Sequence, residues 1–459
     1  MSGGAGHTQI TLAEAIARIL ALEQEDRLDE ADDLADRVLA AAPAHPHVLH
    51  VTGIIAYKKG RIDEAIRRME AAISLAPLVG LYTRNICEVY RGAGRLADAA
   101  KAARQAVAVA PGDSQAHFNL ALIHYEQLDL DGAIAAANDA LALEPDFAEA
   151  HFEKAEALLL AGRMQEGWES YEWRFRLKQA EGMLPKTGKP QWDGSNLAPG
   201  RLMIIADQGF GDCVQFARLI PWAAARAPRP ILACSLELTS LLRQVPGLGK
   251  LVNHWEQTGD YDAYVPLSGL PRLAGITATN IPAAEPYLKT SPALLAAWAA
   301  RLEQLVPGHL RRIALVWAGR PTHRNDRKRT LSLAQFAPLF ARRDIALLSV
   351  QKGPAADEIG DYFGAAPLIN LGPEIGDFAD TMAILQNVER LVSIDTSVLH
   401  VAGASGVPAS LVLPYAPDWR WLLNRADTPW YGSVSLFRQH REYDWSGVIE
   451  RVAADLDAP

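Results

Sequence analysis

Residues 112–145 read GDSQAHFNLALIHYEQLDLDGAIAAANDALALEP, and this 34-residue segment is one copy of a pattern that recurs along the first part of the chain. Four prolines follow one another at this spacing: Pro43, Pro77, Pro111 and Pro145. The same register carries small residues at Ala31, Ala65, Ala99 and Ala133, and again at Ala72, Ala106 and Ala140. It also carries Gly60, Gly94 and Gly162, with Leu128 where a fourth glycine would stand. A fixed period of about 20–50 residues marks repeat architectures, so the pattern predicts a helical solenoid.

Each class of repeated residue has a mechanical role in a pair of helices. Glycine can end the first helix in a left-handed conformation, the alanines let two helices approach closely, and proline cannot continue the second helix. A helix-turn-helix period of this kind resembles the tetratricopeptide repeat. We expect five helix pairs over residues 10–179, the last of them degenerate and aromatic between Gly167 and Phe175. That last pair is expected to cap the solenoid and pack on the next domain.

Solenoids of this type usually hold peptides on a concave face. Asn85 and Asn119 are 34 residues apart and occupy the sixth position of their repeats, which faces the groove in proteins with this repeat. A side-chain amide can both donate to and accept from an extended peptide backbone. These asparagines are therefore candidate peptide-binding residues; the alternative is two solvated side chains that happen to match in register.

Composition excludes several classes of protein. The 459 residues carry a formal net charge of -9, which argues against a partner of duplex nucleic acid. The three cysteines, Cys87, Cys213 and Cys234, form no C-x-x-C pair, so neither a disulfide framework nor a zinc site is expected. A reducing cytoplasm fits this usage best. The N-terminus shows no basic run followed by an apolar core, so no signal peptide is expected, and no apolar stretch reaches the roughly 20 residues of a membrane span.

Beyond a linker at residues 180–200, rich in Gly, Pro and Lys, apolar runs alternate with helical patterns. Strands are predicted at Leu202–Ala206, Ile231–Cys234, Ala263–Pro266, Ile313–Trp317, Ala346–Val350, Leu391–Ile394 and Ser410–Leu413. Helices are predicted between them, for example at Cys213–Ala225, Pro292–Leu305, Leu333–Arg342, Phe378–Gln386 and Val398–Ala404. Such alternation predicts parallel sheets covered on both faces. The length suits two sheets, so we expect lobes at 201–305 and 306–459.

Ligands of open parallel sheets bind at the carboxyl ends of the strands, and a glycine-rich loop follows the first predicted strand there. It reads Ala206-Asp207-Gln208-Gly209-Phe210-Gly211-Asp212. Gly209 and Gly211 would allow close approach to a ligand, and Asp212 would lie in the first turn of a helix. Val214 stands where a dinucleotide fingerprint has its last glycine, so a dinucleotide cofactor is poorly supported. The alternative for Asp212 is an ordinary helix-capping residue.

A basic loop follows the strand at Ile313–Trp317. Five Arg or Lys residues fall within the ten residues from Arg320 to Arg329, and His323 lies among them. Planar guanidinium groups suit bidentate binding of phosphate, which makes Arg320, His323 and Arg329 candidates for binding an anionic ligand. A solvated basic loop is the alternative.

Two further loops follow predicted strands. One contains Gln351, Lys352 and Gly353, and the other runs from Asp395 through Thr396 and Ser397 to His400 at the start of a helix. Hydroxyl groups and backbone amides at a helix start form an anion site, and His400 lies one turn further on. A packed or capping histidine is the alternative.

Together these motifs resemble those of a known family. Gly209-Phe-Gly211-Asp212, with Asp395-Thr-Ser-Val-Leu-His400-Val-Ala-Gly-Ala-Ser-Gly-Val-Pro408, is similar to the heptosyltransferase group of glycosyltransferases. That family usually has glycine where Ser397 stands. Including Pro190–Gly194 and Trp419–Arg425, the arrangement resembles bacterial proteins that join tetratricopeptide repeats to this catalytic domain, some of which modify flagellins. It is more distantly similar to the O-GlcNAc transferases.

The resemblance implies a GT-B fold, with two Rossmann-like lobes, the acceptor mainly on the first and a nucleotide sugar on the second. It implies Asp212 as the catalytic base and no metal or other cofactor. Arg320, His323, Arg329, Gln351, Lys352, Gly353, Asp395, Thr396, Ser397 and His400 would bind the donor, while Asn85, Asn119, Gly209 and Gly211 would serve the acceptor. We therefore expect a glycosyltransferase acting on a protein hydroxyl, with flagellin as one candidate acceptor. Two alternatives stay open: a lipid or polysaccharide acceptor, and a non-catalytic peptide-binding scaffold with a decayed transferase domain.

Overall fold

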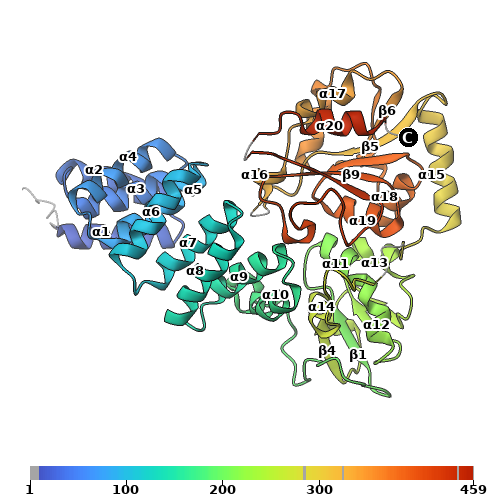
Figure 1. Cartoon of the computed structure of the whole chain (residues 1–459), viewed down its shortest axis with the longest axis horizontal. Coiled ribbons are helices and arrows are strands. Elements are labelled where there is room, and N and C mark those ends of the chain that lie inside the picture. The colour runs from blue at the N-terminus through green and yellow to red at the C-terminus, as the bar shows by residue number, and fades with distance from the viewer. Residues whose placement is uncertain (1–9, 283–285, 323–324, 442–443, 458–459) are drawn as a thin grey trace, which may run out of the picture. The chain divides into compact units, whose positions relative to one another are not determined.

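The computed structural model describes residues 10–282, 286–322, 325–441 and 444–457, and Figure 1 traces the elements along the chain. Contacts divide the chain into two compact units, Met1–Ala157 and Leu158–Pro459. The boundary falls inside helix α9 (Ala148–Leu160), earlier than the end of the repeat pattern at residue 179. It falls there because α10 (Met164–Tyr171) packs against α14 (Leu270–Leu273) of the second unit.

Helices occupy the segment where the sequence predicts five helix pairs, which confirms the solenoid. Between residues 12 and 171 the structure has ten α-helices. Besides α9 and α10 they are α1 (Leu12–Gln24), α2 (Leu28–Ala41), α3 (Pro46–Lys58), α4 (Ile62–Leu75), α5 (Gly80–Gly92), α6 (Leu96–Val109), α7 (Ser114–Glu126) and α8 (Leu130–Leu143). The repeated alanines are fully buried between paired helices, since Ala31, Ala65, Ala99 and Ala133 expose at most 1% of their surface.

One backbone conformation recurs at the turn inside each helix pair. Five residues spaced 34 apart have a positive φ there: Asp26 (58°), Gly60 (78°), Gly94 (73°), Leu128 (60°) and Gly162 (78°). The following amide then bonds back across the turn, as the N–H of Arg61 does to the carbonyl of Ala56 at 2.8 Å. Leu128 therefore makes the same turn as the glycines, although a left-handed conformation costs an L-residue about 1–2 kcal/mol.

The second unit contains two parallel sheets. The first has the order β3-β2-β1-β4 and the second the order β10-β9-β8-β5-β6-β7. Their strands are β1 (Leu202–Ile205), β2 (Ile231–Ala233), β3 (Lys250–Val252), β4 (Ala263–Pro266), β5 (Arg311–Val316), β6 (Ile345–Ser349), β7 (Leu368–Asn370), β8 (Arg390–Ile394), β9 (Ala409–Leu413) and β10 (Val434–Arg438). The seven predicted strands are all present. Prediction missed β3, β7 and β10, which lie at sheet edges.

Helices connect these strands, and two of them differ from the sequence prediction. The helices are α11 (Phe210–Phe216), α12 (Ile220–Ala224), α13 (Leu236–Leu242), α14, α15 (Pro292–Leu305), α16 (Asp326–Arg329), α17 (Ala337–Phe340), α18 (Phe378–Leu385), α19 (Ser397–Ser405) and α20 (Val448–Asp455). The predicted helix 213–225 is broken before Pro221, and the predicted helix 333–342 is broken before Pro338, because proline starts a helix more readily than it continues one. None of the described helices is both long and apolar enough to cross a lipid bilayer.

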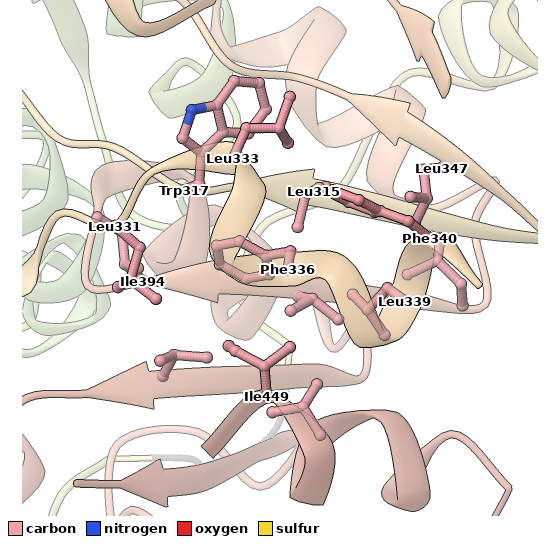
Figure 2. Packing of buried hydrophobic residues seen from close by; sticks show 14 of the residues in the cluster. Leu315, Trp317, Leu331, Leu333, Phe336, Leu339, Phe340, Leu347, Ile394 and Ile449 are labelled. Atoms are coloured by element: carbon pink, nitrogen blue, oxygen red, sulfur yellow. The ribbon is translucent and has the colours of Figure 1, made fainter. Parts of the chain in front are cut away.

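The core of the second sheet forms on one face of β5, β6 and β8. Leu315 and Leu347 from neighbouring strands pack with Phe336, Leu339 and Ile449 from the helical layer, and all five are buried (Figure 2). This rigid layer fixes the positions of the loops that leave the strands at their carboxyl ends.

An aromatic cluster joins α10 to both lobes of the second unit. Trp168 exposes 1% of its surface, and its indole N–H donates to the carbonyl of Ile276 at 2.8 Å. Its ring meets those of Phe216 and Trp419 edge-on, with centroids 6.5 and 5.2 Å away. Phe216 belongs to the first lobe and Trp419 to the second, so Trp168 buries surface against each.

We predict that Trp168→Ala lowers the free energy of unfolding of the second unit by about 3–5 kcal/mol, since it leaves a large cavity and an unpaired carbonyl. All 11 tryptophans lie beyond residue 157, so tryptophan fluorescence during urea unfolding reports this unit alone. Phe363→Ala, at a side chain that is 89% exposed, is the matched control and should change stability by less than about 0.5 kcal/mol. Equal stabilities for the two variants would show that the cluster is not a junction.

Candidate functional site

The strand order of the second sheet brings three predicted loops together at the carboxyl ends of its strands, which we call the carboxyl edge of the sheet. Chain order reverses between β5 and β8, and the crevice outside the carboxyl ends at such a reversal is where ligands of these sheets bind. Val316 of β5 pairs with Ser393 of β8, and Leu315 pairs with Ser349 of β6. The loops that follow these three strands therefore emerge side by side.

The loop after β5 folds tightly around Arg329. The N–H of Gly319 donates to the hydroxyl of Thr330 at 3.0 Å, and that hydroxyl donates to Asp326 at 2.9 Å. A side chain at Gly319 would collide with Asp326 and press on Arg329. Arg329 is mostly buried, and its Nε lies 3.8 Å from the Asp326 carboxylate, an ion pair too long to be a hydrogen bond; this Nε has no hydrogen-bond partner among the described residues. Arg320 is exposed, and His323 lies outside the described residues.

The loop after β6 is held by Gln351. Its buried side-chain oxygen accepts from the N–H groups of Trp317 and Ala318, and its nitrogen donates to the carbonyls of Ala318 and Lys352. The amide is fully engaged by the backbone, so Gln351 shapes the loops and offers no free group to a ligand. Lys352 is exposed, and its ammonium donates to the carbonyl of Ile375 at 2.6 Å. Gly353 has a φ of 82°, which a glycine adopts without strain.

The loop after β8 leads into α19, whose N-cap is Thr396. Thr396 and Ser397 are half-buried, and the hydroxyl of Thr396 lies 3.4 Å from that of Ser393. Asp395 is buried and accepts from the indole N–H of Trp421 at 2.9 Å. His400 is buried as well, and its Nδ1 shares a 2.8 Å hydrogen bond with the hydroxyl of Tyr431.

Burial shifts the pKa values of Asp395 and His400 in opposite directions. It raises the pKa of Asp395 to about 6, helped by the nearby Asp418 and opposed by Arg329. It lowers the pKa of His400 to about 3, and the charge of Arg420 acts in the same direction. The Nε2 of His400 is 3.9 Å from Asp395. His400 is therefore a neutral imidazole at pH 7 and contacts the carboxylate as a polar, uncharged group.

The glycine-rich loop of the first lobe, and helix α11 that follows it, contact the second lobe at this carboxyl edge. Asp212 lies in the first turn of α11, with a side chain that is 22% exposed, and it forms an ion pair with Arg420 of the second lobe. Burial raises the pKa of Asp212, while the charge of Arg420 and a hydrogen bond with the Gly209 backbone oppose that rise. The Gly209 bond resembles helix capping, so part of the alternative interpretation of Asp212 holds alongside the ion pair.

Gly211 allows α11 and α19 to approach each other. A side chain added there would come within 2.7 Å of the His400 ring. Gly211 therefore packs against the His400 ring, whereas the sequence predicts that it contacts an acceptor. Gly209 is the N-cap of α11 with an extended backbone, and it faces Asp212.

Arg420 is a site residue that sequence reasoning did not assign. It is buried and donates to Asp212, to Gln215 at 2.7 Å and to Asp418 at 2.7 Å. One signal was available: residues 419–421 place an arginine between two tryptophans, whose rings can attract a guanidinium.

Two aromatic residues were missed as well. Tyr431 holds His400 through its hydroxyl, and Trp421 holds Asp395 through its indole N–H. Their position in the chain gives no indication of these partners, so both depend on the folded structure for their role.

In the first unit, the two groove asparagines bond to the neighbouring repeat. The Nδ2 of Asn85 lies 3.1 Å from Nε2 of His50, and that of Asn119 donates to the carbonyl of Arg84 at 3.2 Å. Both side chains are half-buried. A peptide would have to share or replace these bonds.

Comparison with known proteins identifies the repeats. Residues 16–79, 88–143 and 124–172 match the family model of the tetratricopeptide repeat. The first part of the chain consists of tetratricopeptide repeats. Among solved structures, a thermophilic tetratricopeptide protein of Thermus thermophilus is 24% identical, covering 37% of this chain and 92% of that one with a TM-score of 0.33. YrrB, described as having an unusual peptide-binding site, is 16% identical, covering 36% of this chain and 85% of that one with a TM-score of 0.30.

A curated relative matches more of this chain than the repeats alone. Protein FlbA of Caulobacter vibrioides is 27% identical over 339 residues, which is 66% of this chain and 54% of the relative. The chain thus spans about half the length of FlbA. Two thirds of the chain is more than the repeats occupy, so the similarity includes part of the α/β region.

We predict that His400→Gln makes the second unit less sensitive to acid. A histidine whose pKa falls from 6.5 to about 3 on folding stabilises the protein above pH 6.5, and this contribution is lost as pH falls through that window. Removing it should reduce the slope of unfolding free energy against pH by up to about 1.4 kcal/mol per pH unit between about pH 4 and 6. The raised pKa of Asp395 acts in the opposite direction and is present in both proteins.

Urea unfolding at several pH values measures this slope. The exposed His254→Gln is the control, and its slope should match that of the wild type. Equal slopes for the two variants would contradict the assignment of His400 as a buried neutral imidazole.

Proposed function

We propose that this protein is a metal-independent glycosyltransferase of the GT-B type that moves a sugar from a nucleotide sugar to a protein hydroxyl. The observation that carries this proposal is the convergence of two carboxyl edges. Asp212 follows β1 of one parallel sheet, while Asp395 and His400 follow β8 of the other, and Arg420 and Gly211 bring the two groups into contact. This is the arrangement that the resemblance to heptosyltransferases implies.

The chemistry assigns a role to each edge. The bond between the anomeric carbon and the nucleotide phosphate breaks, a new bond forms to the acceptor oxygen, and the hydroxyl proton passes to the Asp212 carboxylate. Negative charge develops on the departing phosphate. Arg329, whose Nε has no hydrogen-bond partner among the described residues, and the amide groups at the start of α19 would stabilise that charge. Exposed Arg320 and Lys352 add positive charge along the same edge.

The acceptor is assigned from the repeats. A tetratricopeptide solenoid is suited to hold an extended protein segment on its concave face. We therefore propose a protein acceptor, with flagellin as the candidate suggested by the resemblance. Asn85 and Asn119 would bond to its backbone.

Asp212→Asn should lower turnover by about 10² or more, the usual scale for loss of a general base, while leaving donor affinity near that of wild type. Transfer to the acceptor and nucleotide binding are measured together with melting temperature. Some loss of stability is expected, because asparagine cannot balance the buried charge of Arg420. Normal turnover would remove Asp212 from the mechanism, whereas a variant that no longer binds donor would indicate a structural role only.

Arg329→Met should weaken donor binding by about tenfold or more, the effect of losing one charge-assisted hydrogen bond. Thermal shift with UDP, GDP, ADP and CMP sugars first identifies the nucleotide, since a ligand that binds the native state raises its melting temperature. Titration of that nucleotide then compares the variants. Arg342→Met is the matched control, because Arg342 precedes β6 and lies at the opposite edge of the sheet, where it pairs with Asp344. Equal affinities for both variants would reject the phosphate assignment.

A further inference from the structure

Arg420 is connected to both lobes by directional contacts. It lies in the short 3-10 helix Trp419–Trp421, and its side chain is 9% exposed. One Nη donates to Asp212, the other donates to Asp418 at 2.7 Å, and Nε donates to Gln215 at 2.7 Å. Its guanidinium also stacks on the Trp419 ring, with 4.1 Å between its central carbon and the ring centroid. These contacts fix the plane of one cation.

The same contacts orient the carboxylate of Asp212 from one side. Arg420 bonds to Oδ1, and Oδ2 is turned toward Gly209, where a glycine leaves room for it. Gln215 lies one turn further along α11 and is held by the same guanidinium, so the helix and its acidic side chain are fixed together. A second buried arginine, Arg218, lies on the same stretch but bonds to the carbonyls of Gln215 and Trp430 instead.

We infer that Arg420 is a positioning residue of the transfer reaction, which holds the Asp212 carboxylate ionised and in a fixed orientation toward the acceptor hydroxyl. This inference rests on the proposed function. If it is right, a residue of the second lobe, in Trp419–Trp421, orients the base that the first lobe supplies to the acceptor. Catalysis would then require the two lobes to be in contact.

The charges around Asp212 determine how Arg420 acts. The other titratable groups that act on this carboxylate are Asp418 beside Arg420, Asp207 before α11, and the neighbouring Cys213 and Tyr171. His400 of α19 packs as a neutral ring against Gly211, the residue before Asp212. Two of these groups are acidic and oppose ionisation of Asp212. Arg420 is the cation that counters them, so its removal should raise the pKa of Asp212.

The test compares pH–rate profiles of the full-length protein. A general base works only when ionised, so kcat/KM rises with pH through the pKa of Asp212. Arg420→Met should move this acidic limb upward by about 1–3 pH units, the usual effect of an adjacent opposite charge. Arg420→Lys keeps the charge but cannot make three bonds in one plane, so its limb should stay in place while kcat falls, by up to about 10². Arg218→Lys is the control for disturbing a buried arginine, and its limb should stay in place with a smaller loss of kcat.

Asp212→Asn, assayed alongside, separates the two levels of the proposal. If Asp212→Asn keeps normal turnover, the proposed base is wrong whatever Arg420 does. If Asp212→Asn is inactive but Arg420→Met keeps the wild-type limb, the positioning role is overturned and the proposed function stands. If Arg420→Met does not fold, Arg420→Lys provides the test. A wild-type kcat in Arg420→Lys would show that Arg420 does not position the Asp212 carboxylate. If Arg420→Met does fold, the double variant Asp212→Asn with Arg420→Met should melt higher than Arg420→Met alone, since it no longer buries an unbalanced carboxylate.

Discussion

A single buried guanidinium, that of Arg420, bonds to Asp212 and Gln215 from one lobe and to Asp418 from its own. A charge removed from water is tolerated only when it is paired and its hydrogen-bonding groups are satisfied, so this arrangement is possible in one relative position of the lobes. The close approach of α11 to α19 depends on the same position. Gly211 contributes by leaving the space that the His400 ring fills.

Aromatic rings pack around the residues next to this ion pair. Arg218 lies over the rings of Tyr287 and Tyr431, and the hydroxyl of Tyr431 bonds to His400. Tyr287 belongs to the segment that precedes α15, and its N–H donates to the carbonyl of Ala404 in α19. Trp168 and Tyr171 of α10 pack on Trp419, the residue next to Arg420. The end of the repeat pattern is thereby part of the packing that holds the candidate base, which gives a physical reason why the compact unit begins at Leu158.

Strands that are buried in the structure were predicted from the sequence, and the more exposed strands were missed. The interior strands β1, β2, β5, β6, β8 and β9 have nearly continuous apolar runs, because parallel strands are covered on both faces. The three strands that were missed are edges; β3 has one buried residue in three and β7 has none. The other edge, β4, was found because residues Gln191 and Trp192 cover it, so its residues are buried as well. Among the candidate site residues, Gln351 follows β6 as predicted from the sequence but uses its amide on the backbone, and Gly211 packs against His400.

The sequence by itself determined the repeats, the alternation that predicts two parallel sheets, and the loops at the carboxyl ends of their strands. These features are set by periodicities and turn residues that act within one helix pair or one strand–loop–helix unit. Only the tertiary structure decided which side chains meet: Arg420 with Asp212 across 208 residues of chain, Arg218 with Trp430 across 212, and Trp168 with Ile276 across 108. Such pairs leave no spacing in the sequence, because the burial that makes an ion pair or an indole hydrogen bond favourable arises only when several distant elements pack together.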